Sequence, residues 1–162
     1  YCKNKDVLVL WNNIFDAGSE FDIKPIGLAA RDTLRLEMGF CLYGNELNDE
    51  ITPIEAGLSW ITKTNKIFTS SSFFKRQKEV GVNKRLIGFE MLEKAIPRKG
   101  YAIYSFDKKK IGIVTSGTMS PFLKKGIGLG YVKTNFSDPN TKIFIEIRGK
   151  MKQSLIVNTP FK

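Results

Sequence analysis

The amino-acid sequence predicts an α+β fold in which a short helical N-terminal piece precedes a small antiparallel β-barrel. Apolar side chains recur at helical spacing over residues 4–38, whereas short apolar runs separated by turn residues follow from about residue 83. The length of 162 residues and the hydrophobic content of 42% suffice for a buried core. No apolar run reaches the roughly 18 residues that span a bilayer, so we expect no membrane segment.

Two helices are predicted in the N-terminal part. The first covers residues 4–17, with Asn4 as its N-cap and Gly18 as its end. The second runs from Leu28 to Met38 and ends at Gly39. The apolar positions of the first helix are Val7, Leu8, Leu10, Trp11, Ile14 and Phe15.

Six apolar runs in the C-terminal part predict about six short strands in a barrel or a sandwich, and we favour the barrel. The loop between the third and fourth strands is expected to hold Ser116, Gly117, Ser120 and Pro121. Glycines alternate in the fourth strand, which indicates close backbone approach, a bulge or a barrel bend. The runs are RLIGFEML, YAIYSF, KIGIVTSG, GIGLGYV, TKIFIEIRG and QSLIVNTPF.

The composition excludes several kinds of chemistry. The chain has no histidine, so it cannot supply a Ser/His/Asp nucleophile system, a His-ligated metal or a His general base. Cys2 and Cys41 lie far apart without metal-type spacing, which predicts free thiols, a reducing compartment and no metal site. The net charge of +10 is compatible with nucleic acid, an anionic cofactor or an acidic protein partner.

Arg31 and Arg35 are one turn apart on the second predicted helix. Two guanidinium groups on one face are either solvated surface or a site for an anion. Arg31 could instead form an ion pair with Asp32, with Glu37 or with a carboxylate elsewhere in the chain. We expect Arg35 to be a buried or half-buried partner of a carboxylate. Trp60 is either a core residue or part of a binding site.

Three stretches resemble one known family. They are GLAARDTLRLEMGFCLYGNELNDEITPIEAGLSW (27–60), GIVTSGTMSPFLKKGIGLGYV (112–132) and IVNTPF (156–161). Their order and spacing resemble the aminomethyltransferase, or T protein, of the glycine cleavage system. That resemblance implies transfer of the aminomethyl carbon from the lipoyl arm of the H protein to tetrahydrofolate, with release of ammonia. Sarcosine and dimethylglycine dehydrogenases share weaker versions of these motifs.

The resemblance also implies site residues and a domain organisation. Arg31 occupies the position of the family's folate-contacting arginine, and Trp60 that of a tryptophan beside the folate site. The family's catalytic aspartate precedes the stretch covered here, so we assign no catalytic residue and expect an inactive C-terminal fragment. We predict the end of a folate-binding domain at 1–68, a linker at 69–83 and the barrel at 84–162.

A basic barrel that binds RNA and the folate domain of a related dehydrogenase are the alternative functions. The lysines are dispersed at turns, which is typical of solubility features, so we expect no nucleic-acid partner. The third hypothesis is an interaction surface in which basic residues meet an acidic H protein, with Lys124 and Lys125 as the lysines to test. We further expect a monomeric, cytoplasmic protein that binds folate and contacts no membrane.

Overall fold

The structure is a computed structural model that describes residues 1–161. The chain divides into two compact units, residues 1–31 and residues 32–162. Within the described residues, no helix has both the length and the apolar character needed to cross a membrane.

The first unit is helical, as predicted, but the start of its first helix differs from the expectation. A 3₁₀ turn at Asn4–Asp6 precedes α1 (Val7–Gly18), and a second 3₁₀ turn at Ser19–Phe21 follows it. Asn4 is therefore not the N-cap, because the first turn closes through the bond from the Asp6 N–H to the Lys3 carbonyl. The α-helix ends at Gly18, as predicted, although the φ of Gly18 is −86° and the chain continues directly into the second 3₁₀ turn.

Helix α2 (Leu28–Glu37) begins in the first unit and ends in the second. Gly39 follows it with φ +70°, a conformation that glycine adopts without strain, so the predicted end is confirmed. Residues 40–70 then form turns without a strand of their own. Helix α3 (Ser71–Val80) lies in the segment that we predicted as a linker.

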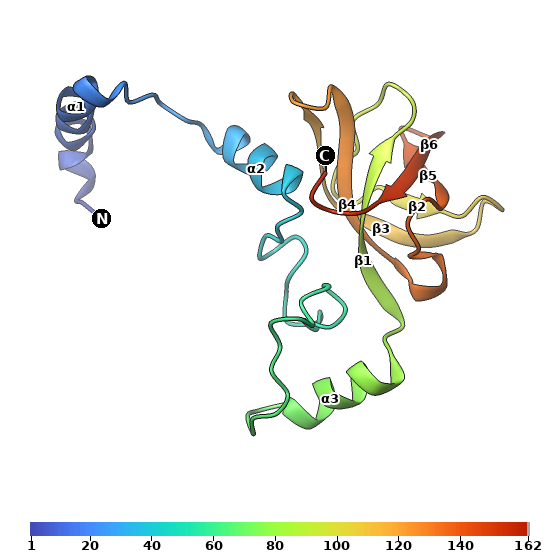
Figure 1. Cartoon of the computed structure of the whole chain (residues 1–162). Helices are drawn as coiled ribbons and strands as arrows, with labels where there is room; N and C mark the ends of the chain where they lie inside the picture. The colour runs from blue at the N-terminus through green and yellow to red at the C-terminus, as the bar shows by residue number, and fades with distance from the viewer. Residues whose placement is uncertain (162) are drawn as a thin grey trace. The chain divides into compact units, whose positions relative to one another are not determined.

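Six strands close into an antiparallel barrel in the order β1-β4-β3-β2-β5-β6 (Figure 1). Each strand pairs with two neighbours, and the pairing of β1 with β6 removes the free edges. The predicted α+β class and the antiparallel barrel are confirmed. The strands are β1 (Lys84–Met91), β2 (Ala102–Tyr104), β3 (Lys110–Ser120), β4 (Lys125–Lys133), β5 (Lys142–Ile147) and β6 (Lys150–Val157).

Strand β3 is longer than the sequence suggested. Ser116, Gly117 and Ser120 belong to this strand, not to a loop, because its pairing with β4 continues as far as Ser120 opposite Lys125. The turn is therefore confined to residues 121–124.

The barrel interior holds the main apolar core, which consists of side chains from all six strands. The alternating glycines of β4 make room for it. A Cβ atom on Gly128 would lie 2.5 Å from Cζ of Phe89, a side chain with no exposed surface. A second cluster joins Leu36 of α2 to Ile127, Leu129 and Phe161, and so attaches the end of α2 to the barrel.

Candidate functional site

An apolar cavity of about 470 Å³ opens beside Trp60 in the second unit. The indole is 74% exposed, so the alternative that Trp60 is a core residue is wrong. Phe40 and Met38 are also exposed at this cavity and present an aromatic and a thioether surface. An apolar wall with a few polar groups is typical of sites for small ring-bearing ligands. The cavity is lined by Met38, Gly39, Phe40, Cys41, Leu47, Ala56, Gly57, Leu58, Trp60, Leu86, Ile87, Gly88, Leu129 and Thr159.

One wall of this cavity, residues 38–47, is held by a buried ion pair. Arg35, whose side chain is 10% exposed, donates from Nη1 to Oε2 of Glu46 at 2.8 Å and to the Phe40 carbonyl at 3.0 Å. Its Nη2 donates to Oγ of Ser116 on β3 at 2.8 Å. The prediction that Arg35 is a half-buried partner of a carboxylate is confirmed, and the partners are Glu46 and Asp32.

The turn that contains Glu46 was missed as a functional element. Asn45 and Glu46 lie in a polar stretch that reads as exposed turn, yet the side chain of Glu46 has no exposed surface. Asn45 donates to Oγ of Ser116 and accepts from Lys99. The signal that could have found Glu46 was Arg35 itself, since a guanidinium expected to be buried or half-buried needs a carboxylate partner.

The C-terminal tail also lines the cavity, through Thr159. The side chain of Thr159 fits between two glycines, since a Cβ atom on Gly39 would lie 2.5 Å from its Cβ and one on Gly88 2.7 Å from its Cγ2. The N–H of Phe161 donates to the carbonyl of Glu37 at 2.9 Å. Side chains larger than hydrogen at either glycine would push the tail away and widen the cavity.

The pKa values of two side chains near Glu46, the Cys41 thiol and the Tyr131 phenol, are raised. Burial, and after it the charge of Glu46, raises the pKa of the Cys41 thiol, although Arg35 acts in the opposite direction. Burial is also the main cause that raises the pKa of Tyr131, whose hydroxyl donates to the Glu46 carbonyl at 2.9 Å. A thiol with a raised pKa is a poor nucleophile at neutral pH, so Cys41 is suited to packing.

Arg31, the other residue that the sequence singled out, is exposed and is the last residue of the first unit. The two carboxylates named as its possible partners, Asp32 and Glu37, bind other side chains. Asp32 accepts from Nε of Arg35 at 2.8 Å, and Glu37 accepts from the hydroxyl of Ser120. The residues that line the cavity beside Trp60 all belong to the second unit, and Arg31 is not one of them.

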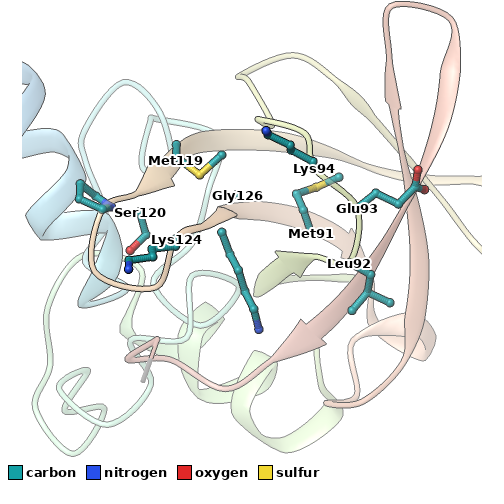
Figure 2. Close-up of a pocket in the computed structure, with 10 residues that line it drawn as sticks. Met91, Leu92, Glu93, Lys94, Met119, Ser120, Lys124 and Gly126 are labelled. Atoms are coloured by element: carbon teal, nitrogen blue, oxygen red, sulfur yellow. The ribbon is translucent and has the colours of Figure 1, made fainter.

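A second hollow, of about 750 Å³, lies where β1 ends and the β3–β4 hairpin turns (Figure 2). Met91 and Met119 contribute its apolar surface, and Lys94 and Lys124 reach it from opposite sides in this view. Lys125 is paired with Glu90 at 3.0 Å, whereas Lys94 and Lys124 form no ion pair with residues 1–161. We call this hollow the lysine groove.

Comparison with known proteins links this chain to one group. Residues 84–162 match the family model described as the glycine cleavage T-protein C-terminal barrel domain, and residues 1–66 match the one described as the GCVT N-terminal domain.

Two curated relatives carry the name aminomethyltransferase. The one from Flavobacterium psychrophilum is 58% identical over 99% of this chain and 45% of its own length. The one from Bacteroides fragilis is 55% identical over 94% of this chain and 43% of its own length. This chain thus spans less than half the length of these relatives.

Among solved structures, part of one crystal structure is similar to this chain. That structure is the glycine cleavage system aminomethyltransferase T from Bartonella henselae, with 33% identity and a TM-score of 0.80. The match covers 85% of this chain and 39% of the other.

Proposed function

Because this chain belongs to the glycine cleavage T-protein family, we propose that it takes part in moving an aminomethyl carbon from the lipoyl arm of an H protein to tetrahydrofolate. Ammonia is released in that reaction. When bound, tetrahydrofolate supplies the nitrogen that accepts the carbon, and the residues of this chain bind and orient it. The cavity beside Trp60 is the observation that carries this proposal.

The cavity fits one part of a folate. Trp60 and Phe40 expose flat aromatic surfaces, against which a planar ring can stack. The cavity walls are mostly apolar and exclude water from a bound ring. We propose Trp60 as a contact for the ring system and Arg31 as a contact for a carboxylate or carbonyl of the cofactor, since its planar fork of donors matches such oxygens.

We assign no catalytic acid or base to this chain. Most carboxylates of the recognised motif are already committed to the fold: those of Asp32 and Glu46 bind Arg35, and that of Glu55 accepts from Thr52. The remaining motif carboxylates include Asp49, which accepts from Tyr43, and Glu37, which accepts from Ser120. These contacts support a role in binding and positioning.

Titration of tetrahydrofolate tests the proposal directly. The chain has two tryptophans, so the emission of Trp60 is isolated in a Trp11→Phe variant. We expect its emission to change on saturable binding of tetrahydrofolate, and we expect no saturable change in a Trp60→Phe variant read through Trp11. Emission that does not respond to tetrahydrofolate in either variant would overturn the role of Trp60.

We further propose that the lysine groove contacts the H protein. Unpaired ammonium groups on either side of an apolar floor favour a partner with acidic and apolar side chains. Met119 suits such a contact because a methionine side chain adapts to different shapes, whereas Met91 is almost fully buried in the barrel core. With an H protein and tetrahydrofolate as its partners, we propose that the protein binds neither a membrane nor a nucleic acid. We also propose that it acts as a monomer in the cytoplasm.

Reversal of charge in the groove tests that contact. In the full-length protein, Lys124→Glu with Lys125→Glu is expected to raise the H-protein concentration at half-maximal rate about tenfold, with little change in the rate at saturation. The matched control reverses Lys108 and Lys109, which lie on the β2–β3 turn outside the groove. Equal effects of the two double variants would show that only the net charge matters.

A further inference from the structure

Glu46 connects three separate parts of the second unit. Its Oε2 accepts from Nη1 of Arg35 on α2 and, at 2.9 Å, from the N–H of Leu42 in the following turn. Its carbonyl accepts from the hydroxyl of Tyr131 on β4. A single residue without exposed surface therefore joins the helix, the turn and the barrel.

The turn that Glu46 closes is a wall of the cavity beside Trp60. Cys41 and Leu47, at the two ends of this turn, both line the cavity. The N–H of Gly44 donates to the carbonyl of Leu47 at 2.7 Å, which folds the turn back on itself. Arg35 fixes the start of the wall through the carbonyl of Phe40. The course of residues 40–47 thus depends on where the carboxylate of Glu46 lies.

The charge of Glu46 is costly to keep. Its other oxygen, Oε1, is buried and receives no hydrogen bond from residues 1–161. Buried ion pairs are often no more stable than apolar residues of similar volume, so stability alone does not account for this one. An apolar pair would not fix the orientation of the turn relative to the helix. The directional hydrogen bonds between the guanidinium and the carboxylate do fix it.

We propose that Glu46, acting through Arg35 and the N–H of Leu42, is a positioning residue that sets the wall of the Trp60 cavity for its ligand. This inference rests on the proposed function only for the identity of that ligand, tetrahydrofolate. Glu46 lies behind the wall and lines no part of the cavity. Its loss therefore weakens binding and leaves the chemical step unchanged.

Glu46→Gln is the decisive variant. The amide keeps the shape and an oxygen for the N–H of Leu42, and it removes the charge that holds Arg35. In the full-length protein we expect the KM for tetrahydrofolate to rise about five- to twentyfold, with kcat within about twofold of the unaltered protein. Glu46→Asp keeps the charge one methylene closer to the backbone, and its KM is expected to lie nearer to the unaltered value.

Amide hydrogen exchange without ligand provides a readout that does not depend on the proposed function. We expect the amides of residues 40–47 to exchange at least about fivefold faster in Glu46→Gln. The control is Ile143→Val, a change in the barrel core away from the wall, which lowers overall stability without this local effect. Its KM should equal that of the unaltered protein.

The outcomes separate the two ideas. Unchanged exchange at residues 40–47 in Glu46→Gln overturns the positioning role, whatever the protein binds. Faster exchange in Glu46→Gln, together with no binding of tetrahydrofolate by the unaltered protein, supports the positioning role and overturns the proposed ligand. A fall in kcat at unchanged KM contradicts the inference, because it would place Glu46 in the chemistry.

Discussion

The guanidinium of Arg35 and the carboxylate of Glu46 meet at 2.8 Å in the second unit, and both side chains are largely withdrawn from water. Removal of one partner would leave the other as an uncompensated buried charge. Asp32, which is about half exposed, gives Arg35 a second carboxylate partner. Asp32 is itself an anion, so it cannot compensate the charge of Glu46. Glu46 therefore depends on Arg35 more than Arg35 depends on Glu46.

Arg35→Ala is expected to lower the free energy of unfolding by about 3–5 kcal/mol, because it strands the charge of Glu46 and leaves the Phe40 carbonyl without a donor. Urea unfolding at neutral pH measures the loss. The control, Arg98→Ala, alters an exposed arginine and should change the free energy by less than about 0.5 kcal/mol. Similar losses in both variants would mean that the pair contributes no more than surface charge.

Residues 84–162 are expected to fold by themselves as the barrel. The main core is built entirely from strand residues in this range, and the closed order of strands leaves no unpaired edge. The loss of Leu36, which packs on Ile127 and Leu129, should lower stability without abolishing the fold. Far-ultraviolet circular dichroism of the separate segment provides the measurement. A random-coil spectrum would refute the domain boundary at residue 84.

Stability should fall at high pH in a way that depends on Tyr131. Burial raises the pKa of this phenol in the folded state above its ordinary value near 10, so the unfolded chain releases its proton first. The stabilisation is complete below about pH 10 and is lost as pH rises toward the folded pKa. In Tyr131→Phe, urea unfolding should show a shallower decline above pH 10. An equally steep decline would assign the effect to other groups.

The sequence was sufficient for the elements whose signals are local. The period-two runs predicted the six strands, and Gly39 predicted the end of α2. The predicted start of the first helix was wrong because Asn4 belongs to a 3₁₀ turn. The geometry of such turns at helix ends depends on a few backbone hydrogen bonds. The predicted length of β3 was wrong because the pairing of this strand with β4, not the type of its residues, decides where the hairpin turns.

The site was less predictable, since its contacts join distant parts of the chain. The partner of Arg35 could be expected to be a carboxylate, but only the fold shows that it is Glu46, eleven residues away, and that Ser116 completes the set. The exposure of Trp60 likewise follows from how residues 52–62 turn, for which the sequence carries no periodic signal. The roles of Arg31 and Trp60 stay predictions.

Arg31→Lys in the full-length protein is expected to weaken tetrahydrofolate binding by roughly ten- to a hundredfold, because lysine keeps the charge and loses the planar fork of donors. Unfolding should be unaffected, since Arg31 is exposed. Titration with tetrahydrofolate measures the change, and Arg98→Lys is the matched control. Unchanged affinity in Arg31→Lys would rule out the proposed contact.

The 162-residue chain by itself is expected to show no aminomethyltransferase activity when supplied with H protein and tetrahydrofolate. Proton transfer by a positioned acid or base typically contributes about 10²–10⁴ to a rate, and the chain offers no histidine for it.

The motif carboxylates are poor substitutes. Asp32 and Glu46 bind Arg35, so both carboxylates are already engaged with its guanidinium. The assay measures methylenetetrahydrofolate against a reaction without protein. Product above that rate that disappears in Glu50→Gln, a change at an exposed motif carboxylate, would show that this chain does carry a catalytic group.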